Sequence, residues 1–210
     1  MNAAAMPRLH VVILAAGFSS RLGRPKALVR VRSWSLLRRT LNLVARFDPA
    51  KITLVLPPRA ARYRIEARGF KVIFAVNSLR GAGLSSSVRR GITVSRCSAA
   101  VLILPVDLAA FDQRDLARMI SRWRAARRRL VARRVAGGPG AAHGGTPLIL
   151  PRWLYAKALD VTGDTGLRDL VRAMPAQQRA LLDLPSASFD VDTPADLHRA
   201  RRQHRTRLKP

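Results

Sequence analysis

Apolar and polar positions along the chain follow two alternating patterns. Short, almost wholly apolar runs predict buried strands, and longer stretches with apolar residues every three or four positions predict amphipathic helices. The strands are expected at 10–15, 52–56, 72–75, 101–105, 130–136, 146–150 and 180–184. The helices are expected at 35–46, 60–68, 84–94, 113–126, 152–159, 167–173 and 194–203. Strands that alternate with helices indicate an α/β fold with a mostly parallel sheet.

Residues at the predicted boundaries support these elements. Asp112 is placed to cap the helix at 113–126, and Thr193 followed by Pro194 is a favourable helix start. A flexible loop is expected to begin at the glycine-rich residues 137–140 and to reach Gly145. The basic tail at 199–210 is expected to fray, which leaves one domain over 1–198.

A loop of small residues follows the first predicted strand and carries the strongest functional signal. It reads LAAGFSSRLGRPK from Leu14 to Lys26. Small side chains allow backbone N–H groups to approach an anion closely, and Arg21 and Lys26 add positive charge, so the loop suits a nucleoside triphosphate. It contains neither the Gly-x4-Gly-Lys-Ser/Thr of a Walker A loop nor the Gly-x-Gly-x-x-Gly of a dinucleotide site.

Aspartates follow two further segments that can reach the same edge of the sheet. Asp107 comes directly after the apolar run at 101–106, where parallel sheets bind ligands, and its carboxylate is a suitable ligand for Mg2+. On the extended segment before the last helix, Asp190 and Asp192 point the same way. These residues could instead serve only as helix caps, and Asp196 is expected to satisfy backbone groups of that helix.

The motifs together resemble those of the MobA-like nucleotidyltransferases. The loop matches Leu-Ala-(Ala/Gly)-Gly-x-x-x-Arg-(Met/Leu)-Gly-x-x-Lys at every fixed position, and residues 190–197 resemble the closing motif Asp-x-Asp-Thr-Pro-x-Asp-Leu. The resemblance implies a Rossmann-like three-layer α/β/α sandwich. It also implies Mg2+ as cofactor on Asp107 and Asp192, with Arg21, Lys26 and Asp107 as the catalytic residues.

The resemblance also implies where the two substrates bind. Residues 77–88 are similar to the family segment Asn-x3-Gly-x-Gly-x-Ser-x-Ser-(Leu/Val), beside the base and ribose. The expected nucleotide-binding residues are Leu14, Ala15, Ala16, Gly17, Ser19, Ser20, Arg21, Gly23, Lys26, Asn77, Gly83, Ser86 and Ser87. The expected acceptor side comprises Gly145, Thr146, Pro147, Asp164 and Arg168. The family's arginine and histidine on that side are Gly144 and Thr146 here, which leaves the acceptor's identity open.

The implied reaction moves a nucleoside monophosphate, predicted to be CMP from CTP, to the terminal phosphate of a molybdopterin-type acceptor and releases pyrophosphate. The base is predicted from Ala16, because the sequence Ala15-Ala16-Gly17 is closer to the cytidylyltransferases of the group and a methyl group narrows the space for a purine. One alternative is a sugar-phosphate or other small-molecule nucleotidyltransferase on the same fold. Another is a non-catalytic basic module that binds nucleic acid or an acidic partner.

Composition limits these possibilities only slightly. The chain has 39 lysines and arginines against 12 aspartates and glutamates, a net charge of +27 that attracts polyanions. Combined with the family resemblance, the basic surface could also dock a client molybdoenzyme that receives the finished cofactor. Scattered arginine fits coding bias better than a dedicated nucleic-acid site. Cys97 is the single cysteine, so no internal disulfide is possible. No membrane-spanning segment or secretory signal is recognised, and a cytoplasmic location is expected.

Overall fold

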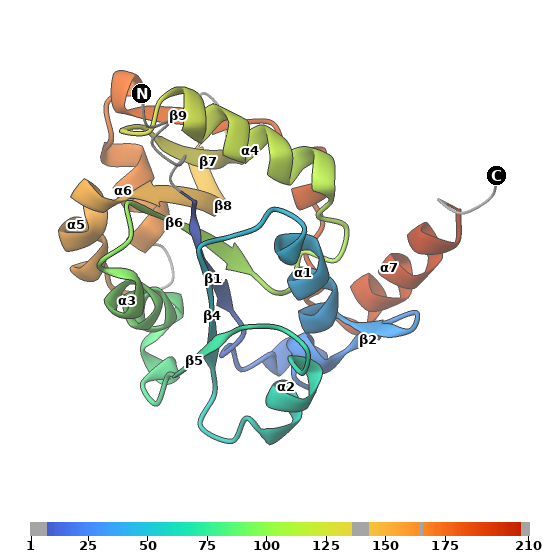
Figure 1. Cartoon of the computed structure of the whole chain (residues 1–210). Helices are drawn as coiled ribbons and strands as arrows, with labels where there is room; N and C mark the ends of the chain where they lie inside the picture. The colour runs from blue at the N-terminus through green and yellow to red at the C-terminus, as the bar shows by residue number, and fades with distance from the viewer. Residues whose placement is uncertain (1–7, 136–142, 164–165, 207–210) are drawn as a thin grey trace.

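A seven-stranded sheet forms the centre of the computed structural model, which describes residues 8–135, 143–163 and 166–206 (Figure 1). Its strand order is β5 (Ile73–Val76), β4 (Lys51–Leu56), β1 (His10–Leu14), β6 (Ala100–Pro105), β8 (His143–Pro151), β7 (Leu130–Val135) and β9 (Arg179–Leu182). The first four run parallel, β8 is antiparallel to both of its neighbours, and β9 is parallel to β7. The mostly parallel sheet was predicted correctly.

Helices cover both faces of this sheet, as Figure 1 shows. One face carries α1 (Leu36–Ala45), α2 (Ala61–Glu66), α4 (Gln113–Ala125) and α7 (Pro194–Thr206). The other face carries α3 (Leu84–Ser95), α5 (Tyr155–Leu159) and α6 (Gly166–Ala173). In β1, Val11 and Ile13 belong to the first core and Val12 and Leu14 to the second, because successive strand residues point to opposite faces. The three-layer sandwich is therefore confirmed.

Short elements complete the chain. The strands β2 (Arg30–Val31) and β3 (Trp34–Ser35) form a small antiparallel hairpin. Single 3-10 turns lie at Ser20–Leu22, Lys26–Leu28, Arg80–Ala82, Arg152–Leu154, Ala176–Gln178 and Pro185–Ala187. No helix among the described residues is long and apolar enough to cross a bilayer.

Each predicted strand and helix corresponds to an observed element, but two boundary predictions were wrong. The loop does not extend to Gly145, because β8 begins at His143 and its glycines pair with Arg133 and Arg134 of β7. The tail is not frayed from residue 199, because α7 continues to Thr206. Ala200 packs there in the core, and the Arg201 guanidinium donates to the Arg30 carbonyl at 3.2 Å.

Candidate active site

The loop after β1 and the segment after β6 leave the sheet side by side. Leu14 pairs with Pro105, and the Val106 N–H donates to the Leu14 carbonyl at 3.2 Å. Because β1 and β6 are parallel, both chains emerge at their carboxyl ends, where ligands bind in open α/β sheets. This arrangement brings the loop at 14–26 next to Asp107.

The loop conformation positions its two cations. Ser19 has a left-handed backbone with φ 57°, and its hydroxyl accepts a hydrogen bond from the Lys26 N–H at 3.0 Å. Gly23 also has a positive φ of 69°, which glycine adopts at no steric cost. The loop therefore folds back on itself, with Lys26 half-buried and Arg21 exposed at its rim.

Four charged side chains meet where the loop faces the end of β6. The Lys26 Nζ lies 3.2 Å from Asp107 Oδ2 and is in direct contact with Asp192 Oδ1. The Arg21 Nη2 lies 2.7 Å from Asp192 Oδ2. Burial by itself lowers the pKa of the Lys26 ammonium, but the attraction of the two carboxylates outweighs it, so the pKa is raised overall. Lys26 is therefore a firmly protonated ammonium between two carboxylates.

The start of α7 holds Asp192 in place. Asp196 Oδ2 accepts hydrogen bonds from the Thr193 N–H at 2.9 Å and from the Asp192 N–H at 3.3 Å. The Thr193 hydroxyl accepts in turn from the Asp196 N–H at 3.2 Å, which completes a reciprocal cap. The predictions that Thr193 starts this helix and that Asp196 satisfies backbone groups are confirmed. Asp112 caps α4 as predicted, accepting from the Asp115 N–H at 3.0 Å.

Asp190 lies behind this cluster. It forms a bridge with Leu108, and the neighbouring Val191 N–H donates to the Asp107 carbonyl at 3.0 Å. The Arg133 Nη1 lies 3.9 Å from Asp190 Oδ1. Burial and then the charge of Asp107 raise the pKa of the Asp190 carboxyl, and Arg133 opposes this only in part.

The donor set beside Lys26 fits a hard cation. Asp107 and Asp192 both contact the same ammonium, which shows that one positive charge can lie between their oxygens. Among the described residues, three or more histidines, cysteines or carboxylates do not come together as a metal cluster. A divalent ion on Asp107 and Asp192 would thus need further oxygens from a ligand, as Mg2+ does when it binds with substrate phosphates.

A cavity of about 330 Å3 opens beside this cluster. Among the predicted nucleotide-binding residues it is lined by Leu14, Ala15, Ala16, Gly17, Ser19, Lys26, Gly83 and Ser87, and also by Asp107. Ser20, Arg21 and Gly23 do not line it. Asn77 and Ser86 do not line it either, but the buried Asn77 amide donates to Ser86 Oγ at 2.9 Å and to Ser87 Oγ at 3.0 Å. Asn77 therefore fixes one wall rather than forming it.

The lining residues that the motif comparison missed include Phe18 and Arg80. The Arg80 guanidinium lies 4.1 Å from the centroid of the Phe18 ring and donates to the Ala16 carbonyl at 3.4 Å. Phe18 is 58% exposed and lines the cavity, so much of its ring surface is open to a ligand there. Both residues occupy variable positions of the motifs, so the motifs could not single them out. They are recognised only in the structure, where the Arg80 guanidinium stacks on the Phe18 ring.

Those predicted acceptor residues that the structure describes do not line this cavity. Gly145, Thr146 and Pro147 lie inside β8 rather than in a loop, Arg168 is exposed on α6, and Asp164 lies outside the described residues. The packing around β8 also explains why glycine stands at position 144, where the family pattern has arginine. A Cβ atom on Gly144 would lie 2.3 Å from Val171 Cγ1, so no side chain fits there unless Val171 or its surroundings shift.

The fold is that of an α/β nucleotidyltransferase domain. The family model of the MobA-like NTP transferase domain matches residues 11–180. The chain belongs to this family of nucleotidyltransferases, as its sequence predicted.

Individual relatives cover nearly the whole chain. A probable molybdenum cofactor guanylyltransferase of Rhodopirellula baltica is 28% identical over 204 residues, which are 94% of this chain and 93% of that protein. The crystal structure of Rv0371c from Mycobacterium tuberculosis H37Rv is 25% identical and superimposes with a TM-score of 0.72, over 93% of this chain and 98% of that one. A manganese complex of Rv0371c gives a TM-score of 0.68 at 23% identity, over the same shares of the two chains.

Proposed function

We propose that this protein transfers a nucleoside monophosphate from an NTP to the terminal phosphate of a molybdopterin-type acceptor and releases pyrophosphate. The observation that carries the proposal is the placement of Lys26 between Asp107 and Asp192, at the mouth of a cavity walled by the loop of small residues. An ammonium, two carboxylates and loop N–H groups at one edge of a sheet suit a triphosphate with a divalent cation.

In this reaction an acceptor phosphate oxygen forms a bond to the α-phosphorus, and the bond from the α-phosphorus to the bridging oxygen of pyrophosphate breaks. The acceptor phosphate is already an anionic nucleophile, so positioning and charge stabilisation supply the catalysis. Arg21 and Lys26 would hold the triphosphate and the departing pyrophosphate. Asp107 and Asp192 would hold Mg2+, which neutralises phosphate charge when bound. The manganese complex of Rv0371c supports the use of a divalent cation in this fold.

For the base we propose guanine, and we retain cytosine as a second candidate. The name of the Rhodopirellula baltica relative supports guanine, so the prediction of CTP is not confirmed. Cytosine is supported by the sequence Ala15-Ala16-Gly17, which is closer to the cytidylyltransferases of the group, and Ala16 is buried in the cavity wall.

For the acceptor, the molybdopterin class rests on the family and on the same relative. A sugar phosphate or another small phosphorylated acceptor is the alternative, because Gly144 leaves no room for the arginine of the family pattern. The acceptor-side residues in β8 therefore cannot reproduce that pattern.

The test measures pyrophosphate release by the full chain with Mg2+ or Mn2+. GTP, CTP, ATP and UTP are offered in turn with molybdopterin, and then with a panel of sugar phosphates. Release with GTP and molybdopterin is expected. Release with CTP alone would assign cytosine instead of guanine as the base and would support the Ala16 argument. Release only with a sugar phosphate would assign that acceptor instead of molybdopterin. If no NTP binds, the protein is a basic binding module and the proposal fails.

A further inference from the structure

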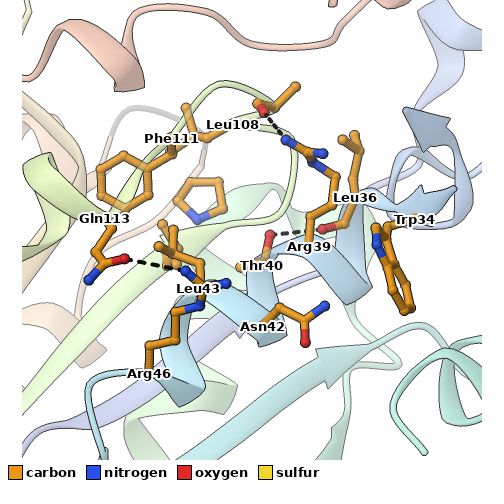
Figure 2. A pocket seen from close by; sticks show the side chains of 13 residues that line it. Trp34, Leu36, Arg39, Thr40, Asn42, Leu43, Arg46, Leu108, Phe111 and Gln113 are labelled. Atoms are coloured by element: carbon orange, nitrogen blue, oxygen red, sulfur yellow. Dashed lines mark hydrogen bonds between the residues drawn. The ribbon is translucent and has the colours of Figure 1, made fainter. Parts of the chain in front are cut away.

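A second cavity lies on the other side of the segment that carries Asp107. It has a volume of about 450 Å3 and lies between α1 and the residues that lead from β6 into α4 (Figure 2). Pro105 lines both cavities, whereas Asp107 lines only the first and Leu108 only the second. The two cavities therefore share one wall, and the volume of the second is within the usual range for small-molecule sites.

The lining of this second cavity combines apolar surface with positive charge. Trp34, Leu43 and Phe111 supply aromatic and aliphatic surface, and Arg39, Arg46 and Gln113 supply hydrogen-bond donors. Trp34 is 46% exposed and Phe111 is only half-buried, so ring surface is available there. No acidic side chain is among the described residues that line the cavity. Such a lining favours an anion that also has an apolar body.

The two arginines are arranged along one face of α1. Arg39 and Arg46, the C-cap of the helix, are seven positions apart, or about 10 Å along its axis, with Leu43 on the same face between them. The Arg39 Nη2 donates to the Ala109 carbonyl at 3.3 Å. The Arg46 Nη1 donates to Gln113 Oε1 at 3.3 Å, as a dashed line in Figure 2 shows. Both guanidinium groups are thereby directed across the cavity, with apolar surface between them.

The charge balance favours an added anion. Burial and the nearby charge of Arg32 lower the pKa of the Arg39 guanidinium, so its charged form has a free-energy cost at this place. An anionic group at this place would relieve that cost. Arginine suits a phosphate group better than lysine does, because its planar guanidinium donates two parallel hydrogen bonds.

From this geometry we infer that the second cavity is a binding site for a small organic phosphate, separate from the NTP site. The phosphate contacts Arg39 or Arg46, and the apolar part of the ligand packs against Leu43, Phe111 and Trp34. The inference does not depend on the proposed function, because it rests on the lining of this cavity alone.

The test uses the chain's three tryptophans as local reporters in an NMR titration of the 15N-labelled full chain with phenyl phosphate. Trp34 lines the cavity, Trp123 is buried in the core, and Trp153 is exposed beside Arg128. The Trp34→Phe variant assigns the indole signal of Trp34. We expect that signal to shift saturably and the Trp153 signal to stay in place. Parallel shifts of both signals would overturn the inference, because they would report general attraction by the +27 charge.

Matched variants and probes sharpen the result. The double variant Arg39→Gln, Arg46→Gln should weaken binding of phenyl phosphate about tenfold or more, the usual loss for charge-assisted hydrogen bonds. Arg90→Gln removes an exposed arginine from α3 on the opposite face and should have no effect. If the double variant does not fold, Arg46→Gln alone decides. If benzyl alcohol binds as tightly as phenyl phosphate, the site does not recognise an anion and the inference fails. If inorganic phosphate binds as tightly as phenyl phosphate, the apolar residues do not contribute to binding and the inference fails.

Discussion

Lys26 Nζ and Asp107 Oδ2 lie 3.2 Å apart, although 81 positions separate the two residues in the chain. The contact joins the loop after β1 to the end of β6, and Asp192 meets the same ammonium from the segment before α7. Three distant segments thus meet at one positive charge. The role of the Asp107 carboxylate can be tested by an amide, which removes the charge and keeps the shape of the side chain.

The first prediction concerns Asp107. The variant Asp107→Asn should lower Mg2+-dependent pyrophosphate release about 100-fold or more, by analogy with the loss of one preorganised charge-stabilising group. Asp48→Asn is the control, because Asp48 is an exposed carboxylate that pairs with Arg8 on the surface. Near-normal turnover of Asp107→Asn in Mg2+ would refute the role assigned to this carboxylate.

The second prediction separates two consequences of removing the ammonium. Lys26→Met should lower turnover about 100-fold or more, because the triphosphate loses its positive partner. The same variant should bind Mn2+ more tightly in the absence of nucleotide, because Asp107 and Asp192 lose the cation that lies between them. Electron paramagnetic resonance measures the free Mn2+. Lys71→Met, at an exposed position, is the control, and weaker Mn2+ binding by Lys26→Met would contradict the metal assignment.

The third prediction concerns Arg80, which stacks on Phe18 at the cavity. Arg80→Met should raise the KM for the preferred NTP about tenfold and reduce discrimination among the four bases, since loss of a partly desolvated cation removes roughly 1–2 kcal/mol. Steady-state kinetics with each NTP measure both effects. Arg62→Met, at an exposed position of α2, should leave them unchanged. An unaltered base preference in Arg80→Met would mean that this arginine does not face the base.

The fourth prediction concerns Gly144. Gly144→Ala should destabilise the protein by about 1–3 kcal/mol, because the new Cβ atom would meet Val171 Cγ1 at 2.3 Å in a packed core. Urea unfolding gives the change. In a double-mutant cycle the Val171→Ala background should make Gly144→Ala much less costly. Independent, additive effects of the two substitutions would exclude this close contact as the cause.

The fifth prediction concerns pH and His10. This histidine is buried, its Nε2 lies 2.7 Å from Thr53 Oγ1, and burial followed by the charge of Lys51 lowers its pKa from 6.5 to about 4. Between these values the unfolded chain holds a proton that the folded chain does not. The free energy of unfolding therefore falls as the pH drops from about 6.5 to about 4, by at most roughly 3 kcal/mol.

Denaturant unfolding at several pH values tests this slope. His10→Gln removes the titrating group and keeps hydrogen-bonding capacity, so its stability should vary less over that pH range than that of the unaltered protein. His198→Gln, at an exposed position of α7, should retain the full slope. The same slope in His10→Gln would show that other groups cause the acid sensitivity.

Local pattern was sufficient for most of the fold. The apolar run at β1 and the caps at Asp112 and Thr193 are short-range signals, and the predicted strand and both caps are present in the structure. The hairpin of β2 and β3 was missed because two-residue strands have no periodicity to detect. The start of β8 was missed because glycine disfavours strands, whereas here the close approach of Val171 demands a glycine at 144.

The candidate site was likewise predictable only in part. Loop motifs predicted Lys26, Asp107 and Asp192 because their spacing along the chain is distinctive. The motifs could not predict that Lys26 joins the two carboxylates, since this contact depends on how three segments pack together. The second cavity beside α1 was beyond prediction for the same reason, because its wall is formed by residues from β6, α1 and the start of α4.

The bridge between Leu108 and Asp190 has a consequence for the order in which the charged cluster assembles during synthesis. A nascent chain that has not yet reached Asp190 already contains the loop at 14–26 and Asp107, but its Lys26 has no Asp192 to contact. The cluster of Lys26, Asp107 and Asp192 can therefore form only after the segment at 190–192 has left the ribosome. A chain cut by a protease before this segment would keep most of the core residues and lose the carboxylate that joins the end of the chain's last strand-to-helix connection to Lys26.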